Sequence, residues 1–159
     1  LEFRRLLFRS ICRRIIESGA NVRWYLIGYG GDEPLICSKI AEAGMEDRVI
    51  ILGKKSNPYP YIKACDIYVQ PSRYEGNSVT VREAQILCKP VVVTDYSTAR
   101  NQVKDGEDGV IVPMDNEACG EGIVRVISSA ELAQALPEML AKSDFGNESE
   151  AEKVSLLLR

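Results

Sequence analysis

Histidine is absent from the 159-residue chain. Its absence excludes a Ser-His-Asp triad, a Cys-His pair and any histidine-ligated metal site in these residues. Acid, base or recognition chemistry must therefore use carboxylates, lysine, arginine, tyrosine or backbone groups. The five cysteines stand apart from one another, without a CxxC pair or the dense spacing of a disulfide framework. We expect them to be buried free thiols.

Long apolar runs and an excess of one charge are also missing. No segment is apolar over the length of a bilayer span, and the first residues lack a signal-peptide pattern, so we expect a cytoplasmic protein. The 20 basic residues nearly balance the 23 acidic ones, for a net charge of -3. This balance gives the chain no positive electrostatic field that would attract a polyanion, and it therefore argues against a nucleic-acid partner. The length and the 45% of hydrophobic residues suit one domain with a sizeable core.

Short segments rich in valine and isoleucine alternate with helical patterns along the chain. Such segments, bounded by Gly, Pro, Asp or Ser, predict strands buried on both faces, and they lie at 22–28, 48–53, 66–72, 89–94 and 109–113. Helical patterns occupy 1–19, 33–44, 57–65, 78–88, 97–103 and 116–143. Strand-helix alternation predicts a doubly wound α/β domain with a parallel sheet. Gly19 and Gly44 are expected to end the two helices that they follow.

The first helical segment is amphipathic and basic. One face carries apolar residues, namely Phe3, Leu7, Ile11 and Ile15, while most of the arginines lie off that face. Two interpretations remain open: a helix packed on the sheet with a solvated basic face, or a helix lying on a membrane surface. At the other end, residues 143–159 are expected to form an acidic linker followed by a short apolar helix.

Residues 71–83, PSRYEGNSVTVRE, place Glu75 before a Gly-Asn-Ser turn and Glu83 inside the helix that follows. Ligands bind open α/β sheets at the carboxyl ends of the strands. The start of the helix offers free N–H groups and a positive dipole end to an anion such as a phosphate. Glu75 would then accept hydrogen bonds from the hydroxyls of an attached sugar, and Glu83 from those of a second sugar such as a ribose.

A structural interpretation competes with this one. TVRE, residues 80–83, also matches a capping box, in which Thr80 caps the helix and Glu83 returns a bond to its backbone N–H. Glu75 can equally be a surface charge of a loop. The spacing of the residues alone leaves these alternatives open.

A glycine-rich turn follows the first predicted strand. In GYGGDE, residues 28–33, Gly28, Gly30 and Gly31 would let the backbone approach a ligand closely, and they would serve a tight turn equally well. The dinucleotide fingerprint requires a further glycine where Glu33 stands. The sequence therefore argues against a nicotinamide-dependent oxidoreductase.

Taken together, residues 66–116 resemble the C-terminal, donor-binding half of the group 1 (family 4) glycosyltransferases of GT-B fold, and the resemblance extends back through 24–53. It implies a Rossmann-like parallel sheet over residues 1–142, with strand order 3-2-1-4-5-6. The first, central strand of that order has no counterpart here, because Leu1 already lies in the helix that follows it. The basic pair that family members carry beside that strand has no counterpart either.

The resemblance also implies roles for individual residues. Glu75 and Glu83 match the family's E-x7-E motif, so that Glu75 would be catalytic and face the donor sugar, and Glu83 would face the nucleotide ribose. The remaining predicted contacts to the nucleotide sugar are Gly28, Gly30 and Gly31 in the glycine turn, Lys54 and Lys55 near the base, and Gly76, Asn77, Ser78 and Val79, whose N–H groups would face the sugar and diphosphate.

The implied function is retaining sugar transfer from a UDP- or GDP-linked donor to a glycan or lipid-linked acceptor, in bacterial surface-polysaccharide synthesis. No metal or other cofactor is expected. Acceptor binding would require an N-terminal domain that these residues do not include, so the chain alone is expected to be inactive. Peripheral association with the inner face of the plasma membrane would fit such an acceptor. The alternatives are a noncatalytic nucleotide-sugar binding module and an epimerase-like domain.

Overall fold

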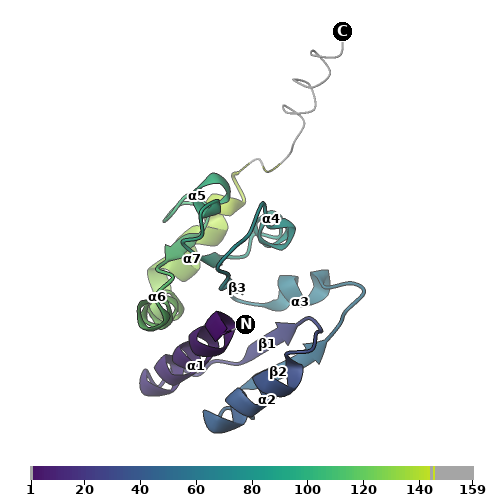
Figure 1. The fold of residues 1–159 in the computed structure, drawn as a ribbon. Coiled ribbons are helices and arrows are strands. Elements are labelled where there is room, and N and C mark those ends of the chain that lie inside the picture. The colour runs from purple at the N-terminus through teal and green to yellow at the C-terminus, as the bar shows by residue number, and fades with distance from the viewer. Residues whose placement is uncertain (1, 144, 146–159) are drawn as a thin grey trace.

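The computed structural model describes residues 2–143 and 145, with side chains from residue 10 onward. Helices and strands alternate along this part of the chain (Figure 1). The strands are β1 (Trp24–Ile27), β2 (Val49–Gly53), β3 (Tyr68–Gln70), β4 (Val91–Thr94) and β5 (Val110–Val112). The helices are α1 (Glu2–Glu17), α2 (Glu33–Glu42), α3 (Tyr59–Ala64), α4 (Val79–Ile86), α5 (Ala99–Gln102), α6 (Asn116–Ser128) and α7 (Ala130–Leu140). The predicted linker and C-terminal helix fall almost wholly outside the described residues.

Every hydrogen-bonded pair among these strands is parallel, which confirms the α/β class. The strands form two sheets, β1-β2 and β3-β4-β5, and Figure 1 shows the smaller sheet beneath the larger one. In the order implied by the resemblance, a further strand would lie between β1 and β3. The sheet is therefore divided at the place where that order requires another strand.

The strands differ in burial, and the prediction of burial on both faces is correct only for some of them. Every residue of β4 and β5 is buried. In β1, by contrast, Tyr25 is 49% exposed and Ile27 is 39% exposed. Successive side chains of a strand point to opposite faces, and in β1 only Trp24 and Leu26 pack against a core cluster.

Helix α1 packs against α6 and α2, and its apolar face is part of the core that also contains residues of both sheets. Its Ile11 and Ile15 are 0% and 1% exposed, and they belong to a core cluster that also contains Val49 of β2 and Val92 of β4. The described part of the apolar face is thus buried in the core of the domain, which favours the first interpretation of this helix. No helix among the described residues combines the length and the apolarity needed to cross a membrane.

Two smaller expectations have different outcomes. Gly19 and Gly44 take left-handed conformations, with φ of 68° and 62°, two residues after the last residue of the helices that they were expected to end. All five cysteines are free, but they are not all buried, because Cys37 is exposed. Burial raises the pKa of Cys12 to about 12, and it is the main cause that raises the pKa of Cys119 to about 12.

Gly109 provides a test of the packing between β4 and β5. A Cβ atom at this position would lie 2.7 Å from Cγ1 of Val103 and 3.0 Å from the carbonyl oxygen of Val91. We expect Gly109→Ala to lower the free energy of unfolding by about 1–3 kcal/mol, because overpacking forces neighbouring groups to move. Chemical denaturation measures this change. Gly31→Ala is the matched control, since a Cβ there meets nothing within 4 Å, and an equal loss in both variants would contradict the packing argument.

Candidate functional site

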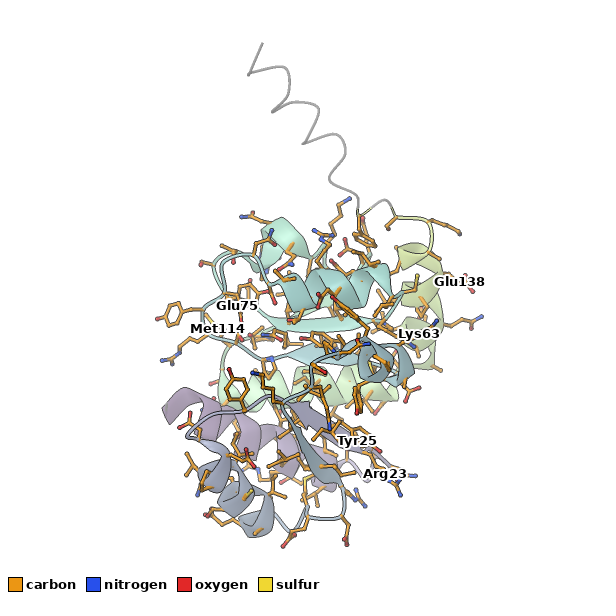
Figure 2. The ribbon with its side chains drawn as sticks, turned by 90° about the vertical axis from the view of Figure 1, so that its right-hand side faces the viewer. Arg23, Tyr25, Lys63, Glu75, Met114 and Glu138 are labelled. Carbon is orange, nitrogen blue, oxygen red and sulfur yellow. The ribbon has the colours of Figure 1, made fainter. Side chains whose placement is uncertain are left out.

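The predicted site lies at the carboxyl ends of the strands. Because the strands are parallel, the loops that follow them emerge on one side of the molecule. Figure 2 shows Glu75 after β3 and Met114 after β5 on one side, with Arg23, which precedes β1, on the other. The segment 71–78 joins β3 to α4 at this edge.

Glu75 is half-buried and oriented by neutral side chains. Its Oε1 accepts hydrogen bonds from Nε2 of Gln70 at 2.8 Å and from Oγ of Ser72 at 2.7 Å. Ser72 is itself fixed to the neighbouring strand, since its backbone N–H donates to Oγ1 of Thr94 at 2.9 Å. The carboxylate of Glu75 is thus oriented by side chains at and just after the end of β3, although it lies in a loop and is partly exposed.

Helix α5 fixes the loop between Glu75 and α4. The Thr98 hydroxyl donates to the backbone carbonyl of Glu75 at 2.7 Å. The buried Gln102 amide accepts from the N–H of Ser78 at 3.1 Å and donates to the carbonyl oxygen of Ser78. Since the N–H of Ser78 is used in this way, it holds the loop rather than facing an anion. Of the four loop residues expected to offer N–H groups, Gly76, Asn77 and Val79 remain as candidates.

Glu83 lies in the second turn of α4, and the start of this helix excludes the capping box. The helix is capped by Ser78, without a side-chain hydrogen bond, and it begins at Val79. Thr80 therefore lies inside the helix rather than at its cap. The carboxylate of Glu83 accepts a hydrogen bond from the hydroxyl of Tyr59 at 2.9 Å. This hydrogen bond raises the pKa of Tyr59, because it stabilises the neutral phenol.

Tyr68, in β3, is linked to Glu75 through the side chain of Gln70. Its hydroxyl donates to Oε1 of Gln70 at 2.8 Å, and Gln70 is a partner of Glu75. Burial is the main cause that raises the pKa of Tyr68, and the negative charges of Glu75 and Glu83 both raise it further. Both carboxylates are thus close enough to Tyr68 to act on its titration.

The loops after β1 and β2 carry the second group of predicted residues. Gly28 has a φ of 155°, which favours glycine, whereas Gly30 and Gly31 lie in open space. Nζ of Lys54 lies 4.7 Å from the centroid of the Tyr29 ring, within this glycine turn. Nζ of Lys55 lies 5.5 Å from the centroid of the Tyr61 ring in α3. Cation–π contacts thus tie each lysine to a tyrosine.

The structure brings the predicted residues together in two groups. One group follows β1 and β2, and the other lies between β3 and the second turn of α4. The hydrogen bond from Tyr59 to Glu83 links α3, which follows the first group, to α4 in the second. Sequence reasoning missed the residues that hold the two glutamates and their loop, namely Tyr59, Gln70, Ser72, Thr98 and Gln102. A glutamine at the end of an apolar strand was the available signal for Gln70.

Comparison with known proteins gives the family. Residues 6–142 match the family described as glycosyl transferases group 1. The chain belongs to this family. It is 30% identical over 117 residues to the N-acetylgalactosamine-N,N'-diacetylbacillosaminyl-diphospho-undecaprenol 4-alpha-N-acetylgalactosaminyltransferase of Campylobacter jejuni, a match that covers 72% of this chain and 32% of that protein. It is 28% identical over 138 residues to the amylovoran biosynthesis glycosyltransferase AmsK of Erwinia amylovora, covering 82% of this chain and 34% of that protein.

Solved structures agree on the fold of this group 1 glycosyltransferase domain. A crystal structure of a Staphylococcus aureus TarM variant, in complex with fondaparinux, alpha-GlcNAc-glycerol and UDP, matches with a TM-score of 0.84 at 21% identity. The match covers 95% of this chain and 32% of that one. The chain thus spans about a third of the length of the relatives that it matches. The neighbours are GT-B glycosyltransferases, so the expected fold is confirmed.

Gln102 provides a test of how the glutamate loop is held. We expect Gln102→Ala to lower the free energy of unfolding by about 1–3 kcal/mol, because the backbone N–H and the backbone carbonyl of the buried Ser78 each lose a partner. Amide hydrogen exchange at Ser78 should become faster in the same variant. Asn101→Ala, at an exposed position of the same helix, is the control. Unchanged exchange at Ser78 in Gln102→Ala would contradict the anchoring role.

Proposed function

We propose that this chain is the donor-binding part of a retaining glycosyltransferase that transfers a sugar from a UDP- or GDP-linked donor. The proposal rests on one observation above all: two carboxylates at the carboxyl edge of the sheets are held by neutral hydrogen-bond donors. An ionised carboxylate only accepts hydrogen bonds, so each can bind the hydroxyls of a sugar. Membership of the glycosyltransferase family and the UDP bound by the TarM variant support the proposal.

In this proposal the two glutamates bind different parts of the donor. Glu75 accepts hydrogen bonds from hydroxyls of the transferred sugar, beside the reacting carbon, and is therefore the catalytic residue. Glu83 binds the hydroxyls of the nucleotide ribose. Hydrogen bonds to a charged group contribute about 1.5–3 kcal/mol each. Two bound sugars would fix the diphosphate that lies between them.

The loop and α4 act on the leaving group. When the bond between the sugar and the diphosphate breaks, negative charge grows on a phosphate oxygen. The N–H groups of Gly76, Asn77 and Val79 and the positive end of the α4 dipole are the groups proposed to stabilise that charge. Lys54 and Lys55 are proposed to lie near the nucleotide base. No metal ion forms part of this proposal.

The acceptor is proposed to be a glycan or a lipid-linked saccharide in bacterial surface-polysaccharide synthesis. Two relatives support this proposal. They are the Campylobacter jejuni enzyme, named for a diphospho-undecaprenol acceptor, and the Erwinia amylovora enzyme of amylovoran biosynthesis. Such an acceptor would bring the protein to the cytoplasmic face of the membrane. Because the chain spans about a third of these relatives, we propose that acceptor binding needs further residues and that the chain alone does not transfer sugar.

Titration of the isotopically labelled chain with UDP, GDP and their sugars, followed by heteronuclear NMR, tests the donor site. We expect shifts centred on residues 75–83 and at Lys54 and Lys55. Glu83→Ala should weaken binding about 10- to 100-fold, because it removes a charged acceptor. Glu46→Ala, at an exposed position between α2 and β2, should bind like the parent chain. A folded chain that shows no shift with any of these nucleotides would contradict the proposal.

A further inference from the structure

The structure gives Glu83 a hydrogen-bond partner that lies outside the E-x7-E motif, namely Tyr59. Its hydroxyl donates to Oε1 of Glu83 at 2.9 Å, across 24 positions of the chain. Tyr59 is 48% exposed and Glu83 is half-buried. The hydrogen bond therefore lies at the surface, at the edge where the proposed nucleotide would bind.

The start of α3 fixes the backbone of Tyr59. Pro58 precedes the helix, Pro60 occupies its second position, and proline restricts φ at both. The side-chain oxygen of Asn57 accepts a hydrogen bond from the N–H of Tyr59 at 3.2 Å. This local geometry restricts the directions that the Tyr59 ring can take.

Helix α3 is in turn packed against the helix that carries Glu83. Ile62 is 5% exposed, and it shares a core cluster with Val81 and Ala84 of α4, both 0% exposed. Close packing of this kind resists small relative movements. The donor and the acceptor of the hydrogen bond are thus both attached to one packed unit.

The hydrogen bond from Tyr59 restricts the orientation of the Glu83 carboxylate. A glutamate side chain has several rotamers, and a free one loses much of that freedom when it binds a ligand. The hydroxyl of Tyr59 engages Oε1 and so orients the carboxylate, while Oε2 lies outside this hydrogen bond. The phenol is neutral, so it orients the carboxylate without neutralising its charge. A carboxylate has about four lone-pair sites, which leaves acceptor capacity for two hydroxyls of a ligand.

We propose that Tyr59 is a positioning residue that holds Glu83 for the vicinal hydroxyls of a ribose, and that the pair selects ribonucleotides over nucleotides without those hydroxyls. This inference rests on the proposed function, because it assumes that Glu83 faces the ribose. It adds Tyr59, which lies outside the E-x7-E motif, and a preference for ribonucleotides that can be measured. Preorganisation of this kind increases affinity by reducing the entropy lost on binding.

The experiment compares UDP with 2′,3′-dideoxy-UDP as probes, by calorimetric titration of the chain and of Tyr59→Phe. We expect the parent chain to prefer UDP. In Tyr59→Phe, the Kd for UDP should rise about 3- to 10-fold while the Kd for the dideoxy analogue stays within about 2-fold, because only the hydroxyl contacts need an oriented carboxylate. Tyr25→Phe, the same change at a tyrosine that is 49% exposed and lies on the side of the molecule away from Glu75 (Figure 2), should leave both constants unaltered.

A double-mutant cycle establishes whether Tyr59 acts through Glu83. In the Glu83→Gln background, Tyr59→Phe should change the Kd for UDP by less than about 2-fold, because the charged acceptor is already lost. Equal weakening of both probes in Tyr59→Phe would indicate a general structural role and overturn the inference. Unchanged binding of both probes would overturn it as well. If UDP binding is lost in Glu83→Gln but unaffected in Tyr59→Phe, the proposed function stands and this inference alone fails.

Discussion

Apolar packing in the core cluster to which α1 contributes holds together two sheets that, in the described part of the chain, share no hydrogen-bonded strand pair. Ile11 and Ile15 of α1 contribute to one core cluster with residues of β2, β4 and β5. Hydrophobic burial is strong but non-directional. It therefore sets how closely the two sheets approach, whereas backbone hydrogen bonds set the register only within each sheet. The positions of the loops after β1 and β2, relative to the loop after β3, depend on this packing.

Directional hydrogen bonds then fix the relative positions of helices that hydrophobic packing alone defines less closely. The bond from Tyr59 to Glu83 joins α3 to α4. The amide of Gln102 joins α5 to the start of α4 through the peptide of Ser78. Each uses an uncharged side-chain group, and uncharged donors or acceptors cost less to remove from water than ions do. Because the phenol of Tyr59 is neutral, its hydrogen bond does not neutralise the charge of Glu83, and a hydrogen bond to an ionised group is stronger than one between neutral groups.

Much of the fold could be predicted from the sequence, because its signals are local. Valine- and isoleucine-rich segments between turn residues located all five strands, and the positive φ of Gly19 and Gly44 follows from the lack of a Cβ atom. The exposed face of β1 could not be predicted in this way. Its composition is that of a buried strand, and exposure depends on whether another part of the structure covers it. The resemblance to the family identified the two glutamates of the candidate site.

The partners of those glutamates were beyond sequence reasoning for a different reason. Tyr59 and Glu83 are 24 positions apart, and nothing in a short, proline-containing helix indicates where a tyrosine hydroxyl will lie. The capping-box interpretation failed because it assumed that the helix begins after Thr80. With Gln102 holding the Ser78 peptide, the helix begins at Val79, so that Glu83 falls in the second turn, where its side chain is free to reach α3.

The position of Glu83 in the helix also sets how far it lies from Glu75. Five residues from the Ser78 cap correspond to roughly 7.5 Å along the helix axis, whereas Glu75 lies in the loop before the cap. A group bound at the start of α4 would therefore have one carboxylate on the strand side and the other further along the helix. Tyr68, whose pKa is raised by both charges in addition to burial, lies near both. A shorter spacing would place the second carboxylate in the first turn, where it would compete with an anion for the same N–H groups.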